Sequence, residues 1–413
     1  MSSPDVAVPG APAVPHGPVT VLDTREAYLD AVRRIAEGTG PVAVDAERAS
    51  GFRYSQRAYL IQVYRRDAGT FLFDPPPIGS FDELDDVLRN EEWVLHAASQ
   101  DLACLREVGL DPARIFDTEL AARLLGLAKV GLGSVVQELL GIHLAKEHSA
   151  ADWSTRPLPQ AWLVYAALDV ELLVDLRDVM TQLLTEQGKT AIAAQEFDAV
   201  LNREVKAVRA EPWRRLSGVH AVRGGRNLAV ARALWEARDE YAREVDTSPG
   251  RLIPDSSLVA VARNLPATKK DLAGMREFTG RASRSQIDRW WNAIEAGLAS
   301  EDLPNLRGTG ESIPPPRSWP ERNPEADKRL KTARPAIAEV AEDLNLPVEN
   351  LLTPEFLRRV AWQPPEPLTA DGIASFLEDL GARAWQIDAT AQVIADAFVE
   401  AAQTPEAAHE AGS

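Results

Sequence analysis

Two carboxylates stand two positions apart at the end of a short apolar segment: Asp45 and Glu47 follow residues 42–44. Side chains alternate along a β-strand, so residues two apart face the same side of a sheet. Carboxylates held side by side repel each other unless a cation neutralises them, and Mg²⁺ and Mn²⁺ prefer oxygen ligands. The pair therefore indicates a candidate metal site, although such pairs are commoner at solvated strand ends.

Two further acids stand at informative positions, Asp101 and Asp169. Asp101 falls in the first turn of a predicted helix over 100–108, where an acid also stabilises the helix dipole. Asp169 comes four residues after Tyr165 in a predicted helix, so the two side chains share one face. A tyrosine packed on the core beside an exposed acid would explain that pair, so neither observation identifies a site alone.

The segments that position these residues alternate between strand-like and helix-like patterns. Short apolar, β-rich runs predict strands, and apolar residues at helical spacing predict helices. We expect strands over 42–45, 59–64, 70–74 and 93–97, and helices over 81–88, 100–108, 117–125, 134–140 and 159–186. Asp117 is expected to cap the helix that follows it. Strands interleaved with helices predict an α/β domain over 19–205.

The rest of the chain predicts helices only. Residues 220–302 contain four amphipathic stretches, and residues 325–403 contain a second helical set. Between them, residues 303–324 are rich in proline and predict a linker. Residues 1–18 and 404–413 predict disordered tails, and the first of these lacks the basic and apolar regions of a signal peptide.

The charge is distributed unevenly along the 413 residues, whose net charge is −17. Residues 20–200 carry 17 basic and 29 acidic side chains, whereas residues 206–300 carry 17 basic and 11 acidic ones. Phosphates need a positive surface, so the middle block is the candidate nucleic-acid-binding region. A solvated arginine-rich surface would give the same counts. The candidate phosphate contacts in this block are Arg223, Arg226, Lys269 and Lys270.

The composition excludes several classes of protein. An apolar share of 45% excludes a wholly disordered chain. No apolar run approaches the roughly 18 to 20 residues that span a bilayer, so no membrane partner is expected. The single cysteine, Cys104, excludes an intrachain disulfide and a cysteine-based metal site, and we expect it to be an inert core residue. A chain without disulfides favours the cytoplasm.

In this order and context, the three acidic motifs resemble those of the DEDDy 3′-5′ exonucleases, and further segments narrow the resemblance to the ribonuclease D family. Residues 220–302 resemble the HRDC (helicase and RNase D C-terminal) module that follows the nuclease in this family. Residues 325–403 resemble a second, more divergent HRDC-like module. The segments that carry the resemblance of the nuclease are 60–62, 96–102, 116–119, 152–158 and 165–170.

The resemblance implies an RNase H-like fold for the exonuclease domain, a mixed sheet flanked by helices, followed by all-α HRDC-type helical domains. It implies a metal-dependent 3′-5′ exoribonuclease that releases nucleoside 5′-monophosphates, with two divalent cations, Mg²⁺ or Mn²⁺, as cofactors. The expected partner is RNA with single-stranded 3′ ends, such as tRNA precursors. A DNA 3′-5′ exonuclease and a catalytically idle HRDC nucleic-acid-binding scaffold remain alternatives, although the intact set of acids argues against the scaffold.

The same resemblance implies roles for five residues. Asp45 bridges both cations, Glu47 and Asp169 complete the site of the cation that activates water, and Asp101 holds the second cation. Tyr165 orients the attacking water, because a phenol with a pKa near 10 is a poor base at neutral pH.

Three more side chains near the motifs are candidate substrate contacts: Arg48, His96 and Arg156. Arg48 stands where the family often has an apolar residue. Ala46 and Gln100 stand in place of a usual threonine and a common acid. None of these departures removes a metal ligand, so they affect the packing of the terminal base rather than the expectation of hydrolysis.

Overall fold

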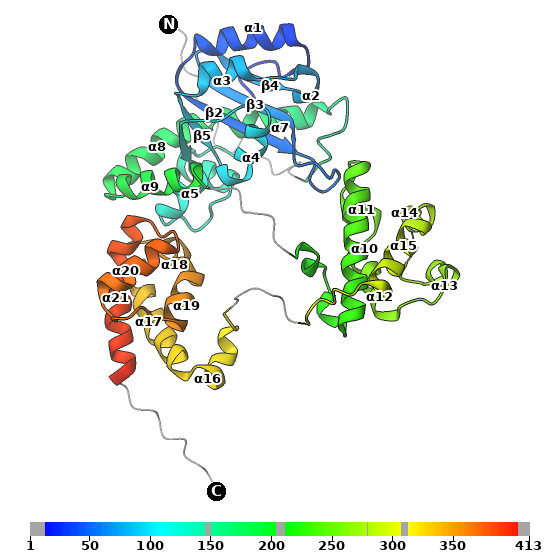
Figure 1. The fold of residues 1–413 in the computed structure, drawn as a ribbon. Coiled ribbons are helices and arrows are strands. Elements are labelled where there is room, and N and C mark those ends of the chain that lie inside the picture. The colour runs from blue at the N-terminus through cyan, green and yellow to red at the C-terminus, as the bar shows by residue number, and fades with distance from the viewer. Residues whose placement is uncertain (1–12, 145–149, 204–210, 279, 307–312, 404–413) are drawn as a thin grey trace, which may run out of the picture.

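The computed structural model describes residues 13–144, 150–203, 211–278, 280–306 and 313–403. Its N-terminal part, up to residue 203, holds a six-stranded sheet flanked by helices (Figure 1). The described residues after it form helices, turns and connecting segments. This confirms the predicted α/β domain and the helical character of the C-terminal region.

The sheet is mixed, with the strand order β1-β4-β3-β2-β5-β6. Its central strand β2 pairs antiparallel with β3, where Asp45 lies opposite Gln62, and parallel with β5. Asp45, the first residue of the first acidic motif, therefore lies on a strand in the interior of the sheet. The strands are β1 (Val21–Leu22), β2 (Thr39–Arg48), β3 (Ala58–Arg66), β4 (Gly69–Phe73), β5 (Glu92–Leu95) and β6 (Arg114–Asp117).

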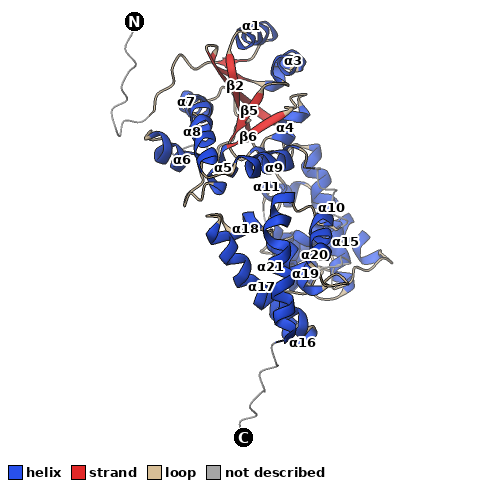
Figure 2. Ribbon diagram, turned by 90° about the vertical axis from the view of Figure 1, so that its left-hand side faces the viewer, coloured by secondary structure: helices blue, strands red, loops and turns tan. Residues whose placement is uncertain are grey.

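Helices lie on both faces of this sheet (Figure 2). On the face of α1 and α3, Tyr28, Phe73 and Phe81 pack edge to face. On the other face, α7 packs against β2, β3 and β4, and α8 packs against β2 and β5. The helices of this part are α1 (Arg25–Ala36), α2 (Pro75–Ile78), α3 (Asp82–Leu88), η1 (Ala98–Gln100, a 3₁₀ helix), α4 (Leu102–Glu107), α5 (Thr118–Leu124), α6 (Leu132–Leu140), α7 (Gln160–Glu171), α8 (Leu173–Glu186) and α9 (Thr190–Leu201).

Several features of this part differ from the prediction, among them the strands β1 and β6 and the short helix α2, which were not expected. The single helix expected over 159–186 is interrupted by a turn at Leu172, which separates α7 from α8. The helices α1 and α9 are not among the expected ones, although the buried residues of α1 follow helical spacing. Those residues are Tyr28, Ala31, Val32 and Ile35.

The middle helical part, residues 211–306, has a core of its own, which contains Trp213 and Trp290. Its two longest helices, α10 and α15, pack so closely that a Cβ atom on Gly297 would lie 2.5 Å from the Cα atom of Val230. The prediction of an HRDC domain over 220–302 concerns this part. Its helices are η2 (Pro212–Arg215), η3 (Val219–Ala221), α10 (Gly225–Glu244), α11 (Pro249–Leu252), α12 (Asp255–Asn264), α13 (Lys269–Gly274), α14 (Arg281–Ser285) and α15 (Ile287–Ala299).

The C-terminal helical part begins inside the predicted linker over 303–324. Trp319 is fully buried and packs against Trp362, with the ring centroids 5.0 Å apart. The linker is therefore shorter than predicted, because residues 316–322 fold with this part. Residues 307–312 lie outside the described residues. The helices are η4 (Pro316–Ser318), α16 (Trp319–Arg322), α17 (Pro324–Asp343), α18 (Val348–Leu351), α19 (Pro354–Trp362), α20 (Ala370–Asp379) and α21 (Ala384–Gln403).

The C-terminal part shares one continuous apolar core with the N-terminal part. At their contact, the buried carboxylate of Glu196 on α9 accepts two hydrogen bonds of 2.6 Å from Arg383. The indole Nε1 of Trp385 donates a third, of 2.8 Å, to the same carboxylate. These two parts of the chain are therefore held together by buried contacts as well as by the chain that connects them.

The predicted tails fall mostly on residues 1–12 and 404–413, which lie outside the described residues. The described end of the first one makes contacts. The amide of Ala13 donates a 3.1 Å hydrogen bond to the carbonyl of His143, and Nδ1 of His16 lies 2.9 Å from a carboxylate oxygen of Glu171. Among the described helices, none is both long and apolar enough to cross a membrane.

Candidate active site

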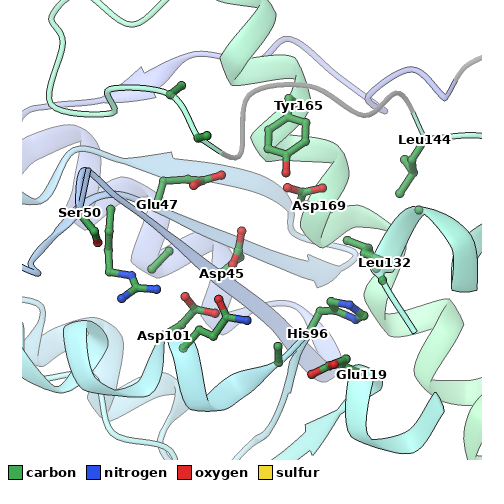
Figure 3. Close-up of a pocket in the computed structure, with 18 of the residues that line it drawn as sticks. Asp45, Glu47, Ser50, His96, Asp101, Glu119, Leu132, Leu144, Tyr165 and Asp169 are labelled. Carbon is green, nitrogen blue, oxygen red and sulfur yellow. The ribbon is translucent and has the colours of Figure 1, made fainter. Parts of the chain in front are cut away.

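A cavity of about 1110 Å³ opens where β2 ends, between α7, the turn that leads into α4, and the start of α6 (Figure 3). The five residues that the sequence motifs singled out all line this cavity. They are Asp45, Glu47, Asp101, Tyr165 and Asp169. The fold thus brings one strand, one turn and one helix together around a single space.

Three of the acids form a compact group. Asp45, Glu47 and Asp169 each offer a carboxylate oxygen, and these atoms lie within 4.8 Å of one another. The alternation of β2 turns the first two toward α7, and α7 supplies the third (Figure 3). The amide Nε2 of Gln62, on the neighbouring strand β3, lies 3.4 Å from Oδ2 of Asp45 and orients that carboxylate. Such a group of oxygens matches the ligands that divalent cations prefer.

Asp101 lines the cavity from a separate turn. It lies between η1 and α4, after Ala97, whose φ of 63° is left-handed. The carboxylate of Asp117 holds this turn by accepting hydrogen bonds of 3.0 and 2.9 Å from the amides of Ala97 and Ala98. Asp117 also caps α5, as predicted. One buried carboxylate therefore fixes both the start of α5 and the turn that presents Asp101.

Tyr165 lies one helical turn before Asp169, and its hydroxyl donates a hydrogen bond to that carboxylate. In Figure 3 the hydroxyl points toward the acidic group. Withdrawal from water and the nearby negative charges raise the pKa of the phenol above its ordinary value. Tyr165 is therefore protonated at neutral pH and can act as a hydrogen-bonding group rather than as a base.

The buried carboxylates of the cavity favour the binding of a positive charge. Burial raises the pKa values of Glu47, Asp101 and Asp169 well above the ordinary range, and repulsion from Asp45 raises each of them further. Arg48, which also lines the cavity, opposes this effect at Glu47 and Asp101. Four carboxylates in one recess repel one another and hold protons more tightly unless cations neutralise them, so the donor set fits divalent metal ions.

His96 lies on the opposite wall from Tyr165 (Figure 3). Its Nδ1 atom is 2.9 Å from the hydroxyl oxygen of Thr118, and burial lowers its pKa to about 4. The imidazole is therefore neutral at physiological pH, which suits hydrogen bonding to a sugar or base rather than charge pairing with phosphate.

The structure places Arg156 away from the cavity. Its guanidinium forms a double hydrogen bond with Asp74, at 2.6 and 2.7 Å, and also donates to the carbonyls of Trp153, Thr155 and Tyr59. Since Nε and both Nη atoms are engaged in these contacts, Arg156 anchors the loop before α7. The expectation that it contacts substrate phosphate is not supported by this position.

The four basic candidates of the middle part also lie outside the cavity. Arg226 donates to the carbonyl of Ser300, and Lys269 pairs with Asp288 at 2.6 Å. Arg223 and Lys270 are exposed. Arg223 and Arg226 adjoin the start of α10, whereas the end of α10 approaches the N-terminal part (Figure 1). At about 1.5 Å per residue, the 20 residues of α10 separate these sites by roughly 30 Å.

The cavity also contains residues that the sequence analysis did not select. Ser50, Gly51 and Phe52 form part of its wall, and Glu119 lies near His96 (Figure 3). The first three lie only three to five residues after Glu47, so their proximity could have been inferred from chain continuity. Glu119 follows the Asp117 cap but carried no spacing signal of its own.

Comparison with known families divides the chain into three matched regions. Residues 19–185 match the model described as 3′-5′ exonuclease, residues 227–294 match the HRDC domain, and residues 312–398 match the 3′ to 5′ exonuclease C-terminal domain. The expectation of a second HRDC-like module in the last region stays a prediction.

Relatives and solved structures agree with this division. Ribonuclease D of Jannaschia sp. is 31% identical over 284 residues, covering 66% of this chain and 72% of the relative. Ribonuclease D of Pseudomonas paraeruginosa is 30% identical over 322 residues, covering 76% and 82%. A crystal structure of a protein from Bifidobacterium adolescentis superposes with a TM-score of 0.87 at 38% identity, over 94% of this chain and 99% of that one. The structure of Escherichia coli RNase D shares the fold, with a TM-score of 0.67 at 23% identity, over 88% and 99%.

Proposed function

This chain belongs to the ribonuclease D family and is a 3′-5′ exoribonuclease, and from that premise we propose that the acidic cavity hydrolyses the 3′-terminal phosphodiester bond of RNA with two divalent cations. The observation that supports this proposal is the group of three carboxylates within 4.8 Å of one another, beside Tyr165. Asp45, Glu47 and Asp169 would hold one cation, and Asp101 with Asp45 would hold the second.

Cations bound at this site would supply a water molecule of lowered pKa and would stabilise negative charge on the attacking and leaving oxygens. The protein's own groups do the rest. The hydroxyl of Tyr165 keeps its proton and donates a hydrogen bond to Asp169, so its oxygen is available to accept a hydrogen bond from the attacking water. That contact orients the water for attack on the phosphorus. The water oxygen ends on the phosphate, and the bond to the preceding 3′ oxygen breaks. A nucleoside 5′-monophosphate leaves, and the shortened RNA takes up the proton lost by water and ends in a 3′ hydroxyl.

Two more cavity residues are assigned to the substrate. His96 binds the terminal sugar or base as a neutral imidazole, because Nδ1 is engaged by Thr118 and its pKa is about 4. Arg48 contacts phosphate or base at the mouth of the same cavity, where it also moderates the repulsion among the acids. Both assignments rest on the position of the side chains in the cavity wall.

Structured RNAs with single-stranded 3′ ends, such as tRNA precursors, are the proposed substrates. The structurally similar Escherichia coli RNase D is described as an exoribonuclease involved in structured RNA processing. Mg²⁺ or Mn²⁺ is the proposed cofactor, and the cytoplasm is the proposed compartment, which rests on the cysteine content alone. The proposed domains are an exonuclease over 19–205, an HRDC domain over 220–302 and a second HRDC-like domain over 325–403, whose described part starts earlier, at residue 313.

The experiment that tests this function compares RNA and DNA of the same sequence, each labelled at the 5′ end, in Mg²⁺ and in Mn²⁺. A tRNA carrying an extended 3′ end is included as the structured substrate. We expect progressive shortening of RNA and release of nucleoside 5′-monophosphates, with trimming of the extension. Shortening of DNA at an equal or higher rate would contradict the RNA assignment, and inertness toward every substrate would favour the idle scaffold.

A further inference from the structure

The loop that follows the catalytic strand is held by the middle helical part. Residues 49–57, here called the rim loop, join β2 to β3, and its residues Ser50, Gly51 and Phe52 line the active-site cavity. In Figure 1 the end of α10 and the short helix α11 lie beside the N-terminal part. The amide of Ser248 donates a 3.0 Å hydrogen bond to the carbonyl of Phe52. The cavity wall is therefore built from two parts of the chain.

The contact continues along the loop, away from the cavity. The hydroxyl of Tyr54 donates to Asp239 at 3.1 Å and accepts a hydrogen bond of 3.1 Å from Arg243, both on α10. The amide of Ser55 donates a 2.9 Å hydrogen bond to Asp246. Backbone and side-chain contacts of this number fix the loop against residues 239–251, and we call this contact the seam.

One arginine of the seam reaches the cavity wall. The guanidinium carbon of Arg251, on α11, lies 3.9 Å from the centroid of the Phe52 ring, and Nε donates a 2.7 Å hydrogen bond to the carbonyl of Gly51. Both residues that it contacts line the cavity. Arg251 is exposed, and within the described parts of the chain no hydrogen bond or ion pair engages its Nη atoms.

The rim loop is the basic side of this contact, since residues 239–251 carry four acidic and two basic side chains. The rim loop contains Arg53 and Arg57 and no acidic residue, although the N-terminal part as a whole is acidic. Arg48 stands just before the loop and also lines the cavity. Arg57 and Arg53 are partly engaged, by Asp246 at 3.9 Å and by Ser154 at 2.8 Å. From the middle part, Arg243 pairs with Asp239, whereas Arg251 adds positive charge beside the cavity-lining residues Gly51 and Phe52.

We propose that the seam is an RNA-binding subsite for the nucleotides that precede the 3′-terminal one, in which Phe52 stacks on a base and the Nη atoms of Arg251 bind a backbone phosphate. An aromatic face beside a guanidinium is a combination that binds single-stranded nucleic acid without sequence preference. Arginine suits phosphate because its planar fork can donate two parallel hydrogen bonds. This inference rests on the proposed active site, since the terminal nucleotide must occupy the acidic cavity for its neighbours to cross the rim.

The subsite also assigns a direct role to the middle helical part. Its contribution to RNA binding then comes from α11 at the cavity entrance, rather than from Arg223, Arg226, Lys269 and Lys270 elsewhere on that part. A strand leaving the cavity would meet Phe52 and Arg251 first. A short single-stranded RNA is therefore long enough to occupy this subsite.

The test compares Arg251→Ala and Arg251→Lys with Arg243→Ala as a matched control. Arg243 belongs to the same seam and lies over the ring of Tyr54 at 5.5 Å, but it does not line the cavity or touch a residue that does. Hydrolysis is measured over a range of salt for a longer single-stranded RNA and for a dinucleotide with a free 5′ hydroxyl, which lacks the phosphate assigned to Arg251. The affinity for the longer RNA is measured separately by fluorescence anisotropy in an Asp45→Asn background.

For the longer RNA, Arg251→Ala is expected to raise KM and the dissociation constant about tenfold, with kcat unchanged. The salt dependence of binding should flatten by about 0.7 in log–log slope, the value for one phosphate contact to a single strand. Arg251→Lys should restore that slope, and Arg243→Ala and the dinucleotide should be unaffected. Phe52→Leu should weaken binding of the longer RNA about five- to 150-fold without changing the salt slope.

Equal losses of kcat on both substrates, or equal effects of Arg243→Ala and Arg251→Ala, would make the seam structural and overturn the proposal. Unchanged affinity and salt slope in Arg251→Ala would overturn it as well. If Arg251→Ala does not fold, Arg251→Lys and Phe52→Leu are tested instead. Their affinities and salt slopes for the longer RNA then decide whether the proposal holds. A failure of the proposed active site would be seen separately, as hydrolysis by the Asp45→Asn protein.

Discussion

Without metal, the Asp45→Asn protein should be more stable than the wild type. With metal, the wild type should be the more stable of the two. In the wild type, oxygens of Asp45, Glu47 and Asp169 lie within 4.8 Å of one another. At an effective dielectric constant of about 20, two unit charges at that separation repel by about 3.5 kcal/mol. Asp45→Asn removes two of the three repelling pairs at almost constant side-chain volume.

The full repulsion is an upper limit on the effect. The raised pKa values of Glu47 and Asp169 favour the protonated carboxyls in the metal-free cluster, which relieves part of the repulsion. We therefore expect Asp45→Asn to raise the free energy of unfolding in EDTA by about 1 to 3 kcal/mol, or several degrees in Tm. The asparagine oxygen can still accept the hydrogen bond from Gln62.

Adding a divalent cation should favour the wild type instead. A ligand that binds only the folded state at 100 times its dissociation constant stabilises that state by about 2.7 kcal/mol. The variant lacks the carboxylate placed to be shared by both cations and should gain much less, while its hydrolysis should be abolished.

The assay is thermal unfolding in EDTA and in a series of Mg²⁺ and Mn²⁺ concentrations. Asp86→Asn is the control, since Asp86 is an exposed acid on α3 on the far side of the sheet. It should follow the wild type throughout. An Asp45→Asn protein that is less stable than the wild type in EDTA, or that gains as much from metal, would refute the assignment of Asp45 as a metal ligand.

Three further predictions follow from the same geometry. Tyr165→Phe should lower kcat by about 10²- to 10⁴-fold in steady-state kinetics, with KM little changed, because the hydroxyl positions water; a change confined to KM would make Tyr165 a packing residue. His96, whose pKa is lowered to about 4, stays neutral in the folded protein while the unfolded chain takes up a proton near pH 6.5. Stability should therefore fall as pH drops from 6.5 toward 4, by up to about 3 kcal/mol, and His96→Gln should remove this component when Tm is measured against pH; an identical pH profile would contradict it. Glu196→Ala should cost about 3 to 5 kcal/mol in denaturant unfolding because it leaves Arg383 and Trp385 without their shared acceptor, and a loss below 1 kcal/mol would show that this contact is dispensable.

The parts of the site that the sequence predicted are those set by short-range periodicity. The two-residue repeat of a strand places Asp45 and Glu47 on one face, and the four-residue spacing in α7 places Tyr165 beside Asp169. That these residues converge on one cavity could not be inferred from local spacing. It was predicted from the resemblance of the ordered motifs to a known family. Asp101 was expected in the first turn of a helix, and in the structure it lies in a turn shaped by the left-handed Ala97.

The remaining features depend on contacts between residues far apart in the chain. Arg156 binds Asp74, and no local pattern distinguishes this use of an arginine from a contact with substrate. Trp319 is buried, although the prolines around it predict a linker. Phe52 and Arg251 meet across the seam, so neither sequence neighbourhood reveals the other. Burial and partner choice are decided by the assembled fold, which the local sequence does not record.

The contact between the N-terminal and C-terminal parts indicates what the C-terminal helices contribute to the nuclease fold. The buried Glu196 and the continuous core make the C-terminal helices a structural support for α9. The middle part instead contacts the rim of the cavity, through residues 239–251. The two helical parts therefore serve the nuclease in different ways, one through the core and one through the cavity wall.

The most direct test of the central claim is a time course of RNA digestion with product analysis, in Mg²⁺ or Mn²⁺ and in excess EDTA. The RNA carries one label at its 5′ end, and the released nucleotides are identified by mass. The acidic cavity predicts a ladder that shortens one nucleotide at a time, release of nucleoside 5′-monophosphates, and no reaction in EDTA or with Asp45→Asn. Digestion that persists in EDTA, release of 3′-monophosphates, or full activity of Asp45→Asn would contradict it.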